Sequence, residues 1–427
     1  MVESRSPLTP DITYLPDTYR FLYKSEEIDV LLDRFREDSD GLMCEATIST
    51  SKQPRPGLLH FGRLNLSSAR SRADAVRALE KRNTNDFLDA DLAGIMEQVC
   101  YLSMRRWREG DPSVDLATVA PRTGARYLLY PFLEYNAINL LYGDGGSAKS
   151  VTALAMMVSV VTGADILETV PATKRNGLYL DWEADRETHA ERLRAICAGA
   201  SVDLPVGRIH YRRMTATLME SAAYIRREIA EKEIGYVVVD SIGMAGGDEP
   251  ERAGVKIALF NAARSLGTTF LGVDHVSKAD PKKPYGSVYT RNIARLMWAV
   301  DKVQKQGDNR VTIALRNEKS NHARLHEPRA YHIDFFNTGG GVDSVLEGVT
   351  WTPTDIRVVP ELAVATKATG AVLILSILKE NGEPMSLEAI LERLEALGRK
   401  TPKSTVAASL TRHPDLFRVE NHLWSPL

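Results

Sequence analysis

Residues 137–154, AINLLYGDGGSAKSVTAL, decide the fold of this chain. An apolar run leads into a glycine-rich segment and then into a second apolar run, which predicts a strand, a loop and a helix. In that arrangement the N–H groups of the loop and the N-terminus of the helix face the anionic oxygens of a nucleotide. The stretch therefore predicts a phosphate-binding loop formed by Gly143, Asp144, Gly145, Gly146, Ser147, Ala148, Lys149, Ser150 and Val151.

Two side chains of this loop have predicted roles. Lys149 reaches the β- and γ-phosphates, and Ser150 holds Mg²⁺. The loop departs from the usual pattern at Ala148, where a glycine normally precedes the lysine. Because alanine adopts right-handed helical angles at a helix start, we expect the loop to keep its function.

The composition is that of an ordinary globular protein long enough for two or three domains: 427 residues, 44% hydrophobic and 26% charged. A formal net charge of -2 gives no overall basic field, so any contact with nucleic acid must come from local patches. The three cysteines are scattered, which argues against a disulfide framework or a zinc site. We find no signal peptide or membrane-spanning run, and the expected location is cytoplasmic.

Three further apolar runs follow the loop, and each ends in polar residues. These runs are 176–183, 235–241 and 269–275, and helical segments lie between them. Strands alternating with helices predict a doubly wound parallel α/β sheet. Since ligands of such sheets bind at the carboxyl ends of the strands, the polar ends should converge on one crevice.

Three side chains at these strand ends are candidates for chemistry. Asp240 is placed to hold the Mg²⁺ shell, directly or through water. Glu183 is the candidate general base that polarises the water attacking the γ-phosphate, and the alternative is a solvated carboxylate. His275 either senses the γ-phosphate or caps its strand.

The order of these motifs resembles the RecA-like ATPases. The loop is followed by Asp181-Trp182-Glu183, then by a Val-Val-Val-Asp-Ser strand end at 237–241, then by Asp274-His275-Val276-Ser277-Lys278. Within that family the chain looks most like the hexameric branch that includes replicative and plasmid RepA-type helicases. The resemblance covers about residues 130–345, and it implies a RecA-like core that binds ATP and Mg²⁺ in a homo-oligomeric, hexameric ring.

Two loops are candidates for DNA contact. The resemblance places the first, 243–252, at a central pore, although its local charge is acidic. In the second loop, 278–287, lysines supply affinity for the DNA backbone and an aromatic ring supplies a stacking surface for single-stranded bases. The alternative is an exposed connector. The candidate residues are Lys278, Lys282, Lys283 and Tyr285.

A strand is expected at 311–315, followed by a polar segment at 316–321. This segment resembles the one that RecA-like hexamers project into the nucleotide site of the neighbouring subunit. A cation supplied in this way stabilises the phosphoryl-transfer transition state and makes hydrolysis depend on assembly. Arg316 and Lys319 are the candidates, with Arg291 and Arg295 as rivals.

The C-terminal region has its own pattern. Helices are expected at 371–379, from Ser386 to Gly398 and at 403–412, followed by a two-stranded ending. This order resembles a winged helix-turn-helix, in which Lys403 and Arg412 on the third helix would reach a DNA groove. The alternative is a module for protein docking.

The N-terminal region predicts a small α/β accessory domain. Strands are expected at 41–50 and 57–66, helices at 67–82 and 90–108, and a poorly ordered arm at 1–16. Its arginines are interpreted as a solvated face, with phosphate contact as the alternative. The expected domains are thus 1–128, 129–360 and 361–427.

These expectations favour a ring-forming, ATP-hydrolysing motor that acts on DNA, as a helicase or a helicase-like replication or recombination factor of plasmid, phage or mobile-element type. The alternative is a nucleotide-switched DNA-binding regulator or loader without unwinding activity. A small-molecule kinase is disfavoured because the chain shows no lid-like arginine-rich segment.

Overall fold

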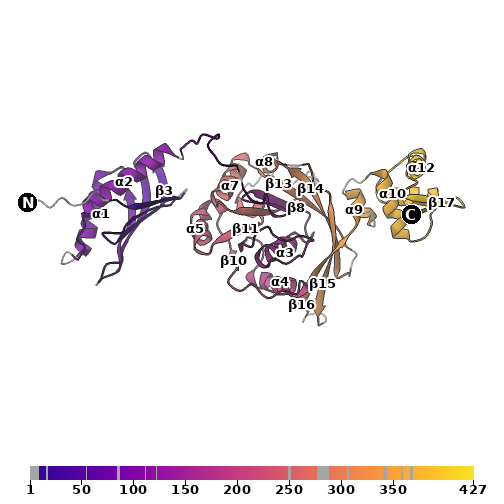
Figure 1. The fold of residues 1–427 in the computed structure, drawn as a ribbon, viewed down its shortest axis with the longest axis horizontal. Helices are drawn as coiled ribbons and strands as arrows, with labels where there is room; N and C mark the ends of the chain where they lie inside the picture. Colours follow the sequence, from indigo (N-terminus) through magenta and orange to yellow (C-terminus); the bar gives the residue numbers. More distant parts are fainter. Residues whose placement is uncertain are drawn as a thin grey trace, which may run out of the picture. The chain divides into compact units, whose positions relative to one another are not determined.

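The computed structural model describes most of the chain, in two compact units, Met1–Thr123 and Gly124–Leu427 (Figure 1). Each unit is considered by itself. The described residues are 9–15, 18–53, 55–83, 87–110, 112–121, 123–248, 252–276, 288–304, 307–322, 324–339, 344–356, 359–365 and 369–427.

The first unit is an antiparallel sheet with two helices on one face. Its strands pair in chain order and are β1 (Asp11–Leu15), β2 (Thr18–Tyr23), β3 (Ile28–Asp38), β4 (Gly41–Thr50) and β5 (Gly57–Asn65). Helices α1 (Ala69–Arg82) and α2 (Leu92–Glu109) share one hydrophobic core with the sheet. The two expected strands and both helices are confirmed.

The expectation of a poorly ordered arm is wrong for Asp11–Leu15, and β2 and β3 were missed. β1 pairs with β2, and the ring of Tyr14 meets that of Tyr19 edge-on at 4.9 Å. The prolines of the segment suggested disorder, but cross-strand pairing and aromatic contact, neither of which is a local signal, hold it in the sheet.

The second unit contains one large sheet, whose nine described strands stand in the order β10-β9-β11-β12-β8-β13-β14-β15-β16. The strands from β10 to β13 run parallel, and β14, β15 and β16 continue the sheet antiparallel. The parallel strands are β8 (Ile138–Gly143), β9 (Asn176–Asp181), β10 (Ile209–Arg213), β11 (Ile234–Asp240), β12 (Thr269–His275) and β13 (Leu296–Val303). The others are β14 (Arg310–Ser320), β15 (Arg329–Thr338) and β16 (Val345–Thr354).

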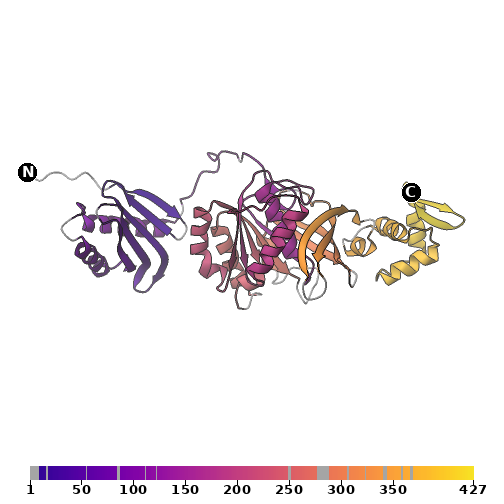
Figure 2. The ribbon, with the colours of Figure 1, turned by 90° about the horizontal axis from the view of Figure 1, so that it is seen from below.

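Helices cover both faces of the parallel part, as seen edge-on in Figure 2. On one face lie α3 (Lys149–Thr162) and α4 (Arg186–Gly199). On the other lie α5 (Leu218–Glu231), α6 (Ile242–Ala245) and α7 (Ala253–Ser265). The expected doubly wound parallel α/β core is therefore confirmed, and the carboxyl ends of β8, β9, β11 and β12 meet at one edge.

Shorter elements complete this part of the chain. A small hairpin of β6 (Tyr127–Leu129) and β7 (Leu133–Glu134) precedes β8. Helix α8 (Val288–Ile293) comes before β13, and α9 (Pro360–Ala365) follows the last strand of the sheet.

The C-terminal residues form the expected three helices and hairpin around a hydrophobic core of their own. The elements are α10 (Gly370–Asn381), α11 (Leu387–Ala396), α12 (Lys403–Arg412), β17 (Phe417–Glu420) and β18 (Leu423–Pro426). A domain boundary at residue 360 stays a prediction.

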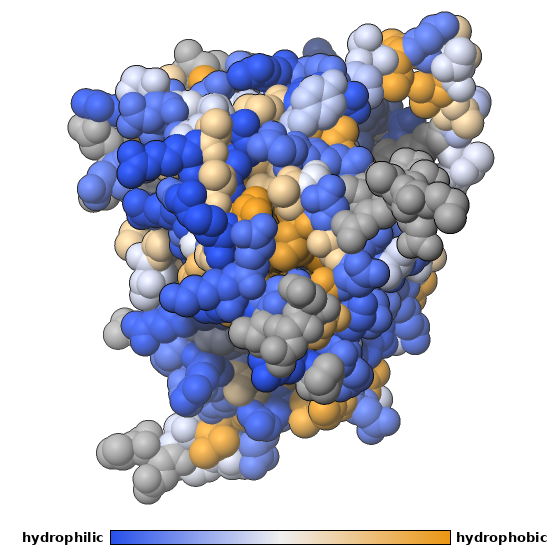
Figure 3. Space-filling view, turned by 90° about the vertical axis from the view of Figure 1, so that its left-hand side faces the viewer, coloured by the Kyte–Doolittle hydropathy of each residue, from blue (hydrophilic) through white to orange (hydrophobic). Residues whose placement is uncertain are grey.

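On the face shown in Figure 3, hydrophilic residues cover most of the described surface and hydrophobic ones form limited groups between them. In the part of the chain that the structure describes, none of the helices has the length and apolar character needed to cross a membrane.

Candidate nucleotide-binding site

The glycine-rich loop joins β8 to α3 and is tightly closed. A Cβ on Gly143 would lie 2.6 Å from the carbonyl oxygen of Val300, so only glycine fits there. The Ser147 hydroxyl and the Lys149 ammonium both donate to the carbonyl oxygen of Asp144, at 2.8 and 2.7 Å. Gly146 has a φ of 66°, which glycine adopts without strain. The loop thus has the strand, turn and helix start that the sequence predicted.

Ala148 is a correction to the sequence analysis. It lies in the left-handed region, with φ 61° and ψ 22°, and not at the right-handed angles that we expected. For a residue with a Cβ this conformation costs roughly 1–2 kcal/mol. The glycine that usually occupies this position could have predicted the left-handed conformation, since glycine is common where the backbone adopts angles that other residues avoid.

Lys149 is buried at the start of α3. Burial lowers the pKa of its ammonium, and the nearby charges of Asp240, Glu183, Asp144 and Asp274 oppose that shift. A buried cation among several carboxylates is well placed to receive the phosphate oxygens of a nucleotide.

Asp240 and Asp181 end neighbouring strands and are register partners between β11 and β9. Asp240 is buried, and it accepts a hydrogen bond from the hydroxyl of Tyr179 at 2.7 Å and another from Ser150. Burial raises the pKa of Asp240, against the opposing effect of these two hydrogen bonds. The structure therefore brings Ser150 and Asp240, the two predicted Mg²⁺ ligands, into direct contact.

Glu183 and His275 face each other across the edge of the sheet. Oε1 of Glu183 lies 3.4 Å from Nε2 of His275, and the side chains are 40% and 47% exposed. The turn that carries Glu183 is fixed by Asp181, whose Oδ1 accepts the backbone N–H groups of Glu183 and Ala184 at 3.0 and 3.1 Å. The predicted base and the predicted sensor are thus adjacent.

Two buried charges near the site were missed in the sequence. Asp274, next to His275, is buried, and burial raises its pKa to about 6 although the charge of Lys256 acts in the opposite direction. Lys256 on α7 is also fully buried. The apolar run that ends in Asp-His drew the prediction to His275, and Asp274 beside it was not considered. The sequence around Lys256 in α7 has no feature that predicts its burial.

Lys302 is a third missed residue. From β13 its ammonium donates to the carbonyl oxygens of Gly145 and Gly146, both at 3.2 Å. The strand LMWAVDKV ends in charged residues, as the other strands of the site do. This pattern could have predicted Lys302 as a site residue.

The polar segment at 316–321 is for the most part not separate from the expected strand, because β14 continues to Ser320. Arg316, 12% exposed, pairs with Asp301 at 3.2 Å and with Glu318. Lys319 donates to the carbonyl oxygens of Arg291, Asn292 and Ala294 at 2.6, 3.1 and 2.6 Å. Both side chains therefore make contacts within their own subunit.

The predicted DNA-contacting residues divide into two groups. Lys278, Lys282, Lys283 and Tyr285 lie outside the described residues. On α12, Lys403 pairs with Glu388, whereas Arg412 stands exposed in the last turn.

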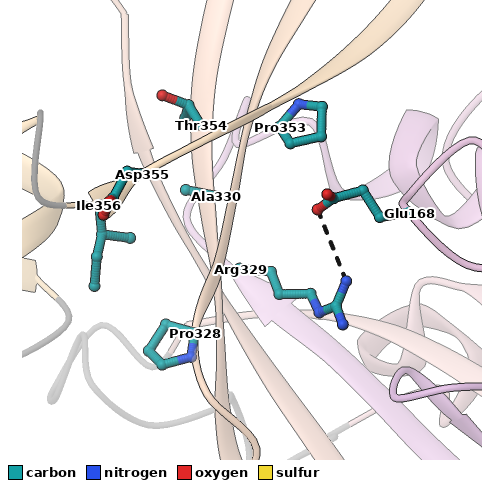
Figure 4. Close-up of a pocket in the computed structure, with 8 residues that line it drawn as sticks. All are labelled: Glu168, Pro328, Arg329, Ala330, Pro353, Thr354, Asp355 and Ile356. Carbon is teal, nitrogen blue, oxygen red and sulfur yellow. Dashed lines mark ion pairs between the residues drawn. The ribbon is translucent and has the colours of Figure 1, made fainter.

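One hollow lies apart from these residues. It has a volume of about 570 Å³ and is lined by residues near the ends of β15 and β16, where Arg329 is paired with Glu168 at 3.8 Å (Figure 4). None of the predicted site residues lines it.

Comparison with known proteins agrees with this geometry. Residues 107–281 match the model of a family described as an AAA domain. The matched segment contains the loop, Glu183, Asp240 and His275. No curated protein matches the chain. Together with the order of the sheet, the family match supports a RecA-like P-loop ATPase domain in this part of the chain.

Among solved structures, the chain is similar to the KaiC-like protein PH0186 of the hyperthermophilic archaeon Pyrococcus horikoshii OT3. The identity is 17%, the match covers 55% of this chain and 100% of the other, and the TM-score is 0.37. At that score the likeness is no guide to function.

Proposed function

We propose that this chain is an ATP-hydrolysing, ring-forming motor that acts on DNA, in the manner of a helicase or a helicase-like replication or recombination factor. One observation supports the proposal above the others. The polar ends of β9, β11 and β12 meet the phosphate loop at one edge of the sheet, where a cation, two oxygen groups suited to a metal ion and a further carboxylate lie close together.

The residues fit ATP and Mg²⁺. The Ser150 hydroxyl and the Asp240 carboxylate are oxygen ligands of the kind that Mg²⁺ prefers, and they lie within hydrogen-bonding distance of each other. Oδ2 of Asp274 is buried and has no hydrogen-bond partner among the described residues, as expected beside a site that holds further polar groups. When bound, Mg²⁺ neutralises the charge that develops on the phosphates.

The protein's own groups supply the rest of the chemistry. Lys149 binds the phosphate oxygens, and the Glu183 carboxylate orients the attacking water and accepts its proton. His275, 3.4 Å from Glu183, stands where it can bond to the γ-phosphate and report its loss.

The ring proposal rests on a cation that one subunit gives to its neighbour. Arg316 is tied into ion pairs of its own, whereas Lys319 lies beside Arg291 and Arg295, whose charges lower the pKa of Lys319 after the larger effect of burial. Like charges held together favour an anion between them. Of this group, Arg291 and Arg295 are exposed and best placed to reach the phosphates of an adjoining subunit.

Strand displacement on forked DNA tests the motor directly. Wild-type protein should unwind in an ATP-dependent manner, and Glu183→Gln should bind ATP yet fail to unwind. Glu231→Gln, which changes an exposed carboxylate in the last turn of α5, is the control and should unwind normally. DNA binding with ATP turnover but no unwinding or translocation would instead favour the nucleotide-switched regulator or loader.

A further inference from the structure

A second hollow lies behind the acidic strand ends, between α4 and the strands β9 and β10. Its volume is about 610 Å³, within the range of small-molecule sites. Three aromatic side chains, Tyr179, His189 and Tyr211, and the apolar Leu154, Leu193 and Ile209 contribute to its lining. The rings of Tyr179 and His189 are 4.4 Å apart, and those of His189 and Tyr211 are 5.4 Å apart.

The same three aromatic residues hold the acids of the nucleotide site. Tyr179 donates to Asp240 at 2.7 Å, and Tyr211 donates to Oδ2 of Asp181 at 2.9 Å. Nε2 of His189 lies 3.2 Å from the same oxygen. Because the other oxygen of Asp181 fixes the turn of Glu183, two hydrogen bonds through Asp181 link the lining of this hollow to the backbone of the proposed base.

Two polar groups in the lining, Nδ1 of His189 and the guanidinium of Arg194, make no hydrogen bond among the described residues. His189 is 5% exposed, and its Nδ1 makes no hydrogen bond to any described residue. Arg194 is exposed and has neither an ion pair nor a hydrogen bond among the described residues, whereas Arg186 is paired with Glu187. A buried polar nitrogen without a partner is costly, and a ligand that bonds to it recovers that cost.

We propose that this hollow is an effector site for a planar aromatic anion, and that its occupation slows ATP hydrolysis. The ring of the ligand packs against the cluster of Tyr179, His189 and Tyr211 from the side of the hollow, its anionic group pairs with Arg194, and an acceptor or donor on it bonds to His189. The ligand draws His189 and Tyr211 away from Asp181, which loosens the turn that carries Glu183. Lys149 and Ser150 keep their places, so ATP still binds.

This proposal rests on the proposed ATPase activity for its kinetic effect, but not for its binding measurement. The probe is naphthalene-2-sulfonate, titrated calorimetrically into the full-length chain. We expect one site per chain, with a dissociation constant of about 0.1–1 mM for a ligand of this size. In steady-state assays the saturating probe should lower kcat for ATP about fivefold or more and leave KM unchanged.

Variants locate the site. Ala190→Trp places a ring in the hollow, so it should abolish probe binding and by itself lower kcat. Ala198→Trp, on an exposed position of the same helix outside the lining, is the matched control and should change neither. Arg194→Gln should weaken probe binding about tenfold, and it provides a second test if Ala190→Trp fails to fold by circular dichroism.

No binding to the wild type, or equal binding to Ala190→Trp, overturns the site, and binding without a change in kcat overturns the effector role. A raised KM with constant kcat would assign the hollow to the nucleotide itself and overturn the proposal. A wild-type chain that binds the probe but hydrolyses no ATP would contradict the proposed function and leave the binding site standing.

Discussion

The parallel and antiparallel halves of the large sheet differ in how their charged side chains are arranged. In the parallel half, Asp181, Asp240 and Asp274 sit at or near strand ends, and the charges of Asp240 and Asp274 act on Lys149. In the antiparallel half, charges pair across neighbouring strands, as in Arg316 with Asp301 and Arg310 with Asp334. Parallel strands bring their carboxyl ends to the same edge, so acidic side chains there gather without an equal number of basic partners. Antiparallel neighbours place acidic and basic side chains opposite each other, so their charges are neutralised in pairs.

The largest expected effect is that of Lys149→Ala. Removing the buried cation should lower kcat/KM for ATP by about 1,000-fold or more, since phosphate contacts of this kind are strongest in the transition state. Arg316→Gln is its counterpart in the antiparallel half and should lower the melting temperature with less than a tenfold loss of ATPase rate. Equal kinetic losses in the two variants would contradict the comparison.

The boundary between the halves carries the proposed cation for the neighbouring subunit. Arg295→Ala should lower kcat about 100-fold or more without weakening ATP binding. A mixture of Arg295→Ala and Lys149→Ala subunits should regain activity, because each supplies what the other lacks. Retention of full activity by a dilute, monomeric wild type would contradict assembly-dependent hydrolysis.

Within the parallel half, Asp181 and Asp274 should respond in opposite directions to Asn substitution. Burial raises the pKa of Asp181, but hydrogen bonds from His189, from the backbone N–H groups of Glu183 and Ala184 and from Tyr211 outweigh it and hold the value at about 2. Asp181 therefore contributes stability that is complete above about pH 4 and is lost as the pH falls toward 2. Asp181→Asn should destabilise the neutral protein by about 2 kcal/mol.

Asp274 has a pKa of about 6, above its usual 3.8. Its charged form is disfavoured in the folded state, so the protein gains stability from this group as the pH falls through 6 toward 4. Asp274→Asn should stabilise the neutral protein by about 2 kcal/mol and flatten that part of the pH profile. Denaturant titrations between pH 4 and 8 measure both variants, and the same sign for the two would refute the assignment.

The smallest expected effect is at Ala148. Replacing it with glycine removes the left-handed strain but adds chain entropy to the unfolded state, for a net gain of about 0.5–1 kcal/mol. Ala148→Val should destabilise the protein and weaken ATP binding, because a β-branched residue is least tolerated at this φ. Thermal denaturation with and without ATP measures both variants.

The sequence predicted those features that local patterns determine. The loop, the strand ends bearing Glu183, Asp240 and His275, and the two-sided helical cover all follow from apolar periodicity and the residues that end each run. The partners of these residues could not be predicted, because Tyr179 and Tyr211 meet the acids through the pairing of β9 with β11 and β10, and His189 meets Asp181 through the packing of α4. The extent of β14 was missed since its polar end is stabilised by cross-strand pairs.

The position of β10 has a further consequence. It is the edge strand of the large sheet, with β9 as its neighbour in the strand order. Edge strands open more readily than central ones, so the backbone amides of β10 should exchange with solvent sooner than those of β11. Tyr211 therefore connects an edge strand of the large sheet to Asp181, so we expect local opening of β10 to weaken the support of the turn that carries Glu183.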